Sequence, residues 1–477
     1  MTSDKFWRNA AAYMFGTAVL KLLPLLLVPI MARFLGADEL GLYELATSYA
    51  LVLQSVATLS LETAVVRFLF RDPSDAARSR LISNSLYSTV GVAALIGILL
   101  VSAPQWIAET FLGSRSHSDI VLVVAGLVLT AGLFNFAVTI FQYLGKVRRY
   151  LELSVGFGLG TGAITLGIVV ILRGGVEAVL LAQLALNGFG AIFVIALLYR
   201  NGLFGARIDL AYWRELLRFS LPILAAVLLM WTTTYGSRAL SVAYLSAADI
   251  GIMSAAMRLA SVVKLLDEGL KMVWSPFVYS NLEAEGHQAE FRDKFTRITI
   301  LSFAGGIVLL LFSVELFELL LPPVYAGGRV AFCIFVTAFC IASSHQLVSI
   351  GATIRERTWL STVVFALGAV VSLGTTMTLI DHFGIAAVPA GLFASAVVMV
   401  VTGWYITERI YPIGYPRIAY AICLITLLSI CAVSILVEGY FGLRFVAAAI
   451  TIVAAAIGAS TRHTAQKALF RERISTE

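Results

Sequence analysis

Long apolar stretches alternate with short polar segments along almost the whole chain. A helix needs about 20 apolar residues to cross the hydrocarbon core of a bilayer, and a window of that length finds fourteen stretches. They cover residues 10–35, 40–64, 81–103, 119–143, 151–172, 177–199, 217–240, 249–275, 295–320, 328–350, 358–380, 385–407, 417–437 and 443–460. The pattern predicts an all-α integral membrane protein, because a spanning helix bonds its backbone polar groups internally.

Charge gives this bundle an orientation. Of the 34 basic residues, 24 fall in the termini and in every second connection or at its edges, and five fall in the other connections or at their edges. The five are Arg33, Arg115, Arg173, Arg329 and Arg444. Cytoplasmic connections carry such an excess, so both termini are predicted in the cytoplasm. The net charge of +6 is explained by this bias, and we expect no nucleic-acid partner.

Composition excludes a soluble catalytic domain. Hydrophobic residues make up 60% of the chain and charged residues 13%, about half of the charged share of a soluble protein. The connections are short and contain no glycine motif for a nucleotide and no metal-ligand cluster. The four cysteines lie in apolar stretches without metal-type spacing. We therefore expect a protein that is not an enzyme and has no resident cofactor or metal.

A weak internal repeat has an offset of 210 residues. FLGADELGLYELATSYALV at 34–52 matches YLSAADIGIMSAAMRLASV at 244–262. The identical pairs include Leu35/Leu245, Ala37/Ala247, Gly41/Gly251 and Ala46/Ala256. The repeat predicts two parallel six-helix lobes, residues 1–200 and 201–408, followed by a helix pair and tail at 409–477. A transport site is then expected between the lobes near the membrane midplane.

The remaining five basic residues are assigned to the interior of the predicted spans, where each costs about 2.5–3.5 kcal/mol at mid-helix. They are Lys21, Arg238, Arg258, Lys264 and Lys271. Because charged residues at this depth face a bundle interior or a wet cavity, we expect these five to line a substrate path. Their charge favours a substrate that carries phosphate.

Three of the five share the eighth predicted span. Arg258, Lys264 and Lys271 are six and seven residues apart, so they lie at successive depths about 10 Å apart. Asp267 and Glu268 stand at helical spacing to Lys271 and Lys264 and could neutralise both lysines. Arg258 has no acidic residue three or four positions away along the chain, which makes it the strongest candidate ligand.

The first and seventh spans carry the other two basic residues. Lys21 precedes Pro24 and Pro29, and a charged, kinked helix is typical of a gating element beside a cavity. The alternative is that the prolines only shape packing and Lys21 pairs with an acid elsewhere. Arg238 could bind substrate or only extend to the interface. The segment WTTTY at 231–235 before it could stack on a sugar or lie in the interfacial aromatic belt.

Two acids of the second span are candidates for coupling transport to H+ or Na+. Glu44 lies within the span, and Glu62 lies near its predicted cytoplasmic end. Glu62 is close in sequence to Arg67, so a surface ion pair is the alternative role for this residue.

Four segments in order resemble a known family. They are RFLGADELGLYELATSY, WRELLRFSLPIL, SRALSVAYLSAADIGIMSAAMRLAS and LLLPPVY. They look like segments of polysaccharide-transporter flippases, which move O-antigen and exopolysaccharide repeat units and belong to the multidrug/oligosaccharidyl-lipid/polysaccharide exporter superfamily. The resemblance covers nearly the whole chain in length, span number and motif order.

The resemblance implies two lobes in a V around a central cationic cavity, in the bacterial inner membrane. It implies alternating access and transfer of an undecaprenyl-diphosphate-linked oligosaccharide from the inner to the outer leaflet, for lipopolysaccharide or exopolysaccharide made by glycosyltransferases and a polymerase. Arg258 falls on the family's recurrent basic position. Relatives often carry an acid at the position of Ser237 and a tyrosine at that of Met253.

Three other functions stay open from the sequence. A drug antiporter of the same superfamily would favour acidic and aromatic pockets, whereas the excess charge inside these spans is basic. A membrane enzyme acting on the same glycolipids would need a large exposed loop or a catalytic constellation. A scaffold of a polysaccharide export complex would not depend on the buried basic residues at all.

Overall fold

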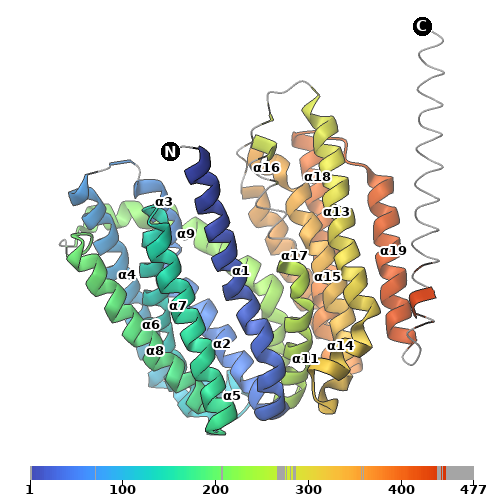
Figure 1. Ribbon diagram of the computed structural model, residues 1–477, viewed down its shortest axis with the longest axis horizontal. Coiled ribbons are helices and arrows are strands. Elements are labelled where there is room, and N and C mark those ends of the chain that lie inside the picture. The colour runs from blue at the N-terminus through green and yellow to red at the C-terminus, as the bar shows by residue number, and fades with distance from the viewer. Residues whose placement is uncertain are drawn as a thin grey trace. The chain divides into compact units, whose positions relative to one another are not determined.

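The computed structural model contains helices and no strand among the residues that it describes (Figure 1). These are residues 3–69, 71, 72, 74–205, 208–265, 274, 277–279, 281, 282, 286–355, 357, 359–437, 442, 444–446 and 449. For residues 3–15 and 17 the backbone alone is described. Contacts divide the chain into a first unit, residues 1–255, and a second unit, residues 256–477.

The first unit is a bundle of long helices joined by short turns. Its helices are α1 (Ser3–Phe34), α2 (Gly36–Thr58), α3 (Leu61–Leu69), α4 (Asp75–Ser102), α5 (Pro104–Leu112), α6 (Ser118–Tyr143), α7 (Val147–Leu166), α8 (Val176–Arg200), α9 (Leu210–Trp231) and α10 (Ser237–Ser241). A 3-10 turn, η1 (Arg115–His117), precedes α6, and π-helical turns η2 (Gly167–Ile171) and η3 (Thr232–Gly236) follow α7 and α9. The helix α11 (Ala247–Ala260) starts in this unit and ends in the next.

The second unit is built in the same way. Its helices are α13 (His287–Leu311), α14 (Ser313–Leu320), α15 (Arg329–Val348), α16 (Ile350–Ile354), α17 (Trp359–Phe383), α18 (Ala387–Ile410) and α19 (Arg417–Leu436), with 3-10 turns η4 (Pro323–Gly328) and η5 (Gly384–Ala386). α15 packs against α13, α18 and α19, and α17 packs against α18.

The helix order of the first half recurs in the second half. α13 begins 212 residues after α4, α15 begins 211 residues after α6, and α18 begins 211 residues after α8. A short helix and a 3-10 turn follow both α4 and α13. These intervals agree with the 210-residue offset of the sequence repeat, so the repeat extends from a short motif to a whole set of helices.

The predicted all-α membrane fold is confirmed. Among the described residues, nine helical stretches are long and apolar enough to cross a membrane, and ten when α2 and α3 are taken as one bent span. One of the nine, Trp359–Ile410, contains both α17 and α18. Each of the first thirteen predicted ranges overlaps a described helix, and the last, 443–460, lies mostly outside the described residues. The count of fourteen therefore stays a prediction.

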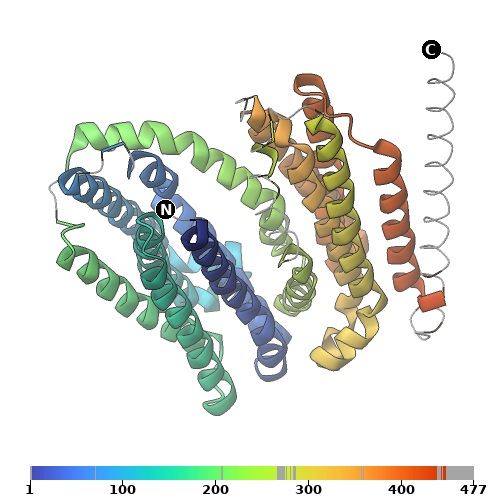
Figure 2. The same ribbon diagram turned by 45° about the horizontal axis from the view of Figure 1, so that its top comes forward.

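One span in each unit occupies the centre. In α6 and in α15, 72% of the most apolar window is buried, against 17% in α7. Figure 2 shows α1 and α7 side by side at the surface of the first unit. A helix that is apolar on all sides is either buried in the bundle or faces lipid, and both kinds occur here.

The contact boundary after 255 differs from the predicted lobe boundary after 200. The reason is that α9 packs against α2 and α3, which groups it with the first six long helices. The boundary of the sequence repeat describes internal similarity and the contact boundary describes packing. The predicted ranges 1–200, 201–408 and 409–477 stay predictions.

Candidate functional site

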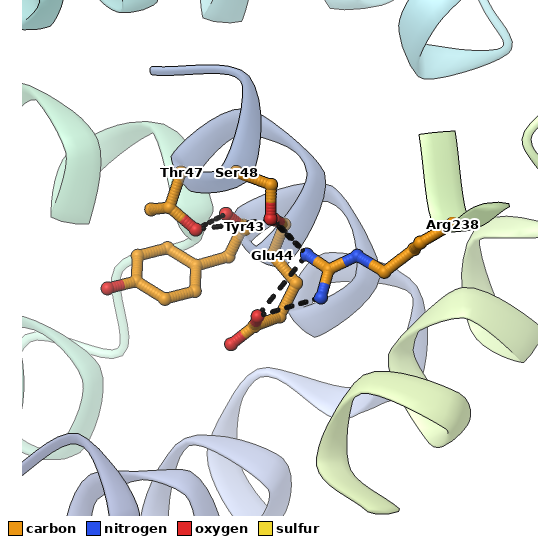
Figure 3. A network of polar contacts seen from close by, with 5 residues as sticks. All are labelled: Tyr43, Glu44, Thr47, Ser48 and Arg238. Atoms are coloured by element: carbon orange, nitrogen blue, oxygen red, sulfur yellow. Dashed lines mark hydrogen bonds and ion pairs between the residues drawn. The ribbon is translucent and has the colours of Figure 1, made fainter. Parts of the chain in front are cut away.

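A buried ion pair joins α2 to α10 in the first unit (Figure 3). Arg238 Nη1 and Nη2 each lie 3.4 Å from Glu44 Oε2, and both side chains are 3% exposed. Arg238 Nη2 also donates to Ser48 Oγ at 2.6 Å and to the Glu44 carbonyl. A buried charge is stable only when paired and hydrogen-bonded, and α2 supplies the pairing and acceptors to Arg238.

The helix turn before Arg238 is irregular. Residues 232–236 form a π-helical turn, and the three threonine hydroxyls at 232–234 donate to carbonyls four residues earlier, at 2.8, 2.8 and 3.2 Å. Trp231 and Tyr235 lie beside one another with ring centroids 5.7 Å apart. A π-helical turn changes the register of the residues that follow it and is frequent at functional sites. Here it precedes the segment that places Arg238 against α2.

The two copies of the sequence repeat contact one another next to this pair. A Cβ added at Gly41 would collide with the Ala247 carbonyl, and one added at Gly251 would collide with the Ala37 carbonyl. Since Gly41 corresponds to Gly251 and Ala37 to Ala247, the crossing of α2 and α11 is reciprocal. Glycine at both positions permits the backbones to approach this closely. The repeat therefore marks a pseudo-symmetric helix crossing within the first unit.

Glu62 lies in a different environment at the other end of the same predicted span. α2 ends at Thr58 and α3 begins at Leu61, with a bend of 42° between them. A cavity of about 310 Å³ opens beside this break. It is lined by Leu51, Gln54, Ser55, Thr58, Ser60, Glu62, Thr63, Gly132, Asn135 and Val227. The predicted alternative partner of Glu62, Arg67, places its guanidinium 4.6 Å from the centroid of the Phe219 ring.

The predicted phosphate ligands fall in two units. Lys21 is exposed on α1, a helix that contains Pro24 and Pro29. Arg258 is half-buried on α11, and Lys264, just after this helix, lies with Nζ 4.0 Å from the centroid of the Phe339 ring. Their convergence with Lys21 stays a prediction, as does the gating role of the two prolines.

The remaining predicted residues on this span lie outside the described part of the chain. These are Lys271 and its two acidic neighbours, Asp267 and Glu268. Among the residues that are described, the pairing of Arg238 with Glu44 is the contact that the sequence interpretation missed. The two residues are 194 positions apart, and Arg238 lies outside the repeat copy at 244–262, so the repeat gave no signal for this contact.

Arginines of the predicted outer connections hold helix ends in the second unit. Arg329 donates to the Ser434 carbonyl at 2.5 Å, in the last turn of α19. Arg444 donates to the Leu311 carbonyl at 2.8 Å, at the end of α13, and pairs with Glu315 at 2.6 Å. The last carbonyls of a helix have no helical donor. These exceptions to the charge bias therefore have structural roles.

Comparison with known proteins identifies the family of this chain. Residues 6–278, more than half of the chain, match the family described as "Polysaccharide biosynthesis protein". The chain belongs to this family. Protein 1 of the Lsg locus of Haemophilus influenzae is 18% identical over 394 residues, which are 80% of this chain and 94% of that protein.

Solved transporter structures share the fold. The lipid II flippase MurJ in an inward closed conformation superposes with a TM-score of 0.74 and 12% identity, over 94% of this chain and 97% of that one. The MATE multidrug transporter DinF-BH gives a TM-score of 0.63 and 13% identity, over 87% and 97%. An inward-facing MATE-family transporter of the MOP superfamily gives 0.62 and 13%, over 84% and 98%. This polysaccharide biosynthesis protein thus has the fold of MOP-type transporters.

Proposed function

We propose that this protein is a flippase for a lipid-linked oligosaccharide. Its substrate is an oligosaccharide on undecaprenyl diphosphate, carried from the inner to the outer leaflet of a bacterial cytoplasmic membrane by alternating access. Both termini lie in the cytoplasm, and the product supplies surface polysaccharide assembly beside glycosyltransferases and a polymerase. The coupling ion is H+ or Na+.

The combination of family and fold carries this proposal. The family match indicates polysaccharide biosynthesis, and the fold that the chain shares over nearly its full length with a lipid II flippase is that of a transporter. A protein of polysaccharide biosynthesis with a transporter fold is suited to the step that moves a finished lipid-linked unit across the membrane. The doubly charged diphosphate needs contact with basic side chains at membrane depth.

Arg258 and Lys264 are our leading candidates for phosphate contact. Both are half-buried rather than fully enclosed. The ring of Phe339 helps to stabilise the Lys264 ammonium in a partly desolvated place. Lys21 and Lys271 complete the proposed cationic path, whereas we assign Arg238 to its ion pair with Glu44.

The test is complementation of surface glycan export in a strain that lacks this protein. We expect Arg258→Ala and Lys264→Ala each to lower export about tenfold or more, because a hydrogen bond to a charged group contributes about 1.5–3 kcal/mol. Arg297→Ala is the matched control, since this arginine is exposed and pairs with Asp293 at 2.9 Å. Full export by the double variant at normal membrane abundance would show that the phosphate assignment is wrong.

A second candidate function, extrusion of small molecules, is favoured by the likeness to MATE transporters. A binding cavity for cationic drugs would need acidic side chains, and the acid Glu44 is already paired with Arg238. Loss of drug resistance with intact surface glycan in the deletion strain would select this alternative.

A further inference from the structure

The break between α2 and α3 has a strained backbone. Leu59 and Ser60 have φ angles of 52° and 54°, in the left-handed region. Each such residue that is not glycine costs about 1–2 kcal/mol, and strain of this kind clusters at functional sites. The break also removes helical donors from the carbonyls of the last turn of α2. Irregular backbone at membrane depth is tolerated where it lines a cavity, and the 310 Å³ cavity lies there.

Side-chain oxygens dominate the polar lining of this cavity. The Thr63 hydroxyl donates to the Ser60 carbonyl at 2.7 Å, the Ser55 hydroxyl to Leu51 at 3.0 Å, and the Thr58 hydroxyl to Ser55 at 3.3 Å. The Ser55 and Thr63 hydroxyl protons are used in this way, so the remaining lone pairs of these two oxygens can act only as acceptors. Gln54 and Asn135 add side-chain amides from α2 and α6, each of which has an oxygen that can accept. Such a set of acceptors suits a cation.

The charge of the lining points the same way. Glu62 is the one ionisable residue that lines the cavity as the described residues form it. Arg67, the nearest basic residue along the chain, packs over Phe219. An anionic substrate group would meet no basic side chain in this lining. A cation would meet one carboxylate and several neutral oxygens.

The number of carboxylates selects the class of cation. Sites for Ca²⁺ combine several carboxylates with neutral oxygens, and affinity follows the count of charged ligands. One carboxylate balances one positive charge. A cavity of this volume also has room for water in the coordination shell.

We infer that the α2–α3 break holds an alkali cation of the Na+ type, with Glu62 as its charged ligand. This inference rests on the proposed transport function and deepens it, because it names the coupling ion and separates the two candidate acids. Glu44 is the counter-ion of Arg238, and Glu62 is the ion-binding acid. Discontinuous helices whose freed carbonyls meet a coupling ion are an established device in secondary transporters.

The experiment measures the apparent melting temperature of the purified full-length protein in detergent. Sodium chloride is titrated against choline chloride at constant ionic strength and pH. A ligand that binds the folded state raises its stability in a saturable way. We expect Na+, but not choline, to raise the melting temperature of the wild type. Glu62→Gln should raise the half-saturating Na+ concentration about tenfold or more, because it weakens Na+ binding.

Two further variants keep the test independent of folding. Asn135→Leu is nearly isosteric, removes one neutral oxygen at an exposed position, and should weaken the Na+ response by about threefold or more. Glu177→Gln is the matched control, because Glu177 is also an acid in the first turn of a helix but is exposed and lies outside the cavity lining. Its response to Na+ should equal that of the wild type.

The outcomes separate this inference from the proposed function. The ion site is overturned if the wild type shows no saturable Na+ response or if the Glu62→Gln protein keeps the full response. Neither result decides the proposed function, which glycan export tests separately. A response to pH alone that Glu62→Gln abolishes overturns the alkali cation and makes Glu62 a proton carrier. The predicted Na+ response combined with normal glycan export in the deletion strain overturns the proposed function and leaves the ion site standing.

Discussion

The two ends of the second predicted span place an acidic residue in opposite environments. Glu44, in the first half of α2, is 2% exposed, and Arg238 and Ser48 accompany it at a helix crossing where two glycines permit close approach. Glu62 follows a bend of 42° and lines an open cavity. The first end is closely packed and charge-balanced, and the second is strained and rich in acceptors. The surroundings of the two acids therefore differ in what distant helices bring to them, an arginine for Glu44 and a cavity lining for Glu62.

The largest expected effect comes from leaving Arg238 without its acid. Glu44→Gln should lower the free energy of unfolding by about 3–5 kcal/mol, because removing one partner of a buried pair leaves an uncompensated charge. Arginine cannot lose its proton to escape this cost. The measurement is the melting temperature in detergent together with the amount of protein in the membrane.

Removing the arginine instead provides the control. In Arg238→Met the carboxylate of Glu44 loses this partner, so we expect this variant also to be less stable than the wild type. The double variant Glu44→Gln with Arg238→Met should be more stable than Glu44→Gln alone, because no buried charge remains. Equal stability of the wild type and Glu44→Gln would show that the pair contributes nothing and would remove the contrast with Glu62.

The glycine crossing is expected to give the next largest effect. Gly41→Ala and Gly251→Ala should each cost about 1–3 kcal/mol, since an extra methyl in a packed contact forces the backbones apart. The two costs should be similar because the crossing is reciprocal. Gly97→Ala in α4 is the control, with no atom within 4 Å of the added Cβ. If Gly41→Ala or Gly251→Ala left the free energy of unfolding unchanged, the close approach of the two backbones at this end of α2 would be contradicted.

Sequence reasoning recovered the features that depend on composition and periodicity. Apolar stretches predicted the helical membrane fold, because hydrophobic length reports directly on the surrounding solvent. The 210-residue repeat predicted the recurrence that α4 and α13, or α6 and α15, display. It also marked Gly41 and Gly251, although it did not show that the two copies touch.

The candidate site was predicted less well, for a physical reason. Pairing of Arg238 with Glu44 depends on two helices 194 residues apart and on the register set by the π-helical turn at 232–236. Neither leaves a periodic signal in the sequence. Likewise, nearness to Arg67 in the chain suggested a surface ion pair for Glu62, but the bend after Thr58 directs it to a cavity lining instead. Local spacing indicates possible partners, and tertiary packing selects among them.

The smallest expected effect comes from relieving the strain at the open end. Ser60→Gly should raise the free energy of unfolding by about 0.5–1 kcal/mol, because glycine adopts φ of 54° without the left-handed penalty, which exceeds the entropy that glycine loses on folding. Ser79→Gly, in the first turns of α4, should lower it by about 0.5–1 kcal/mol. Melting temperatures without Na+ measure both. Since Ser60 also lines the cavity, the stabilised variant should respond less to Na+, and an equal or stronger response would mean that the strained break has no part in holding the ion.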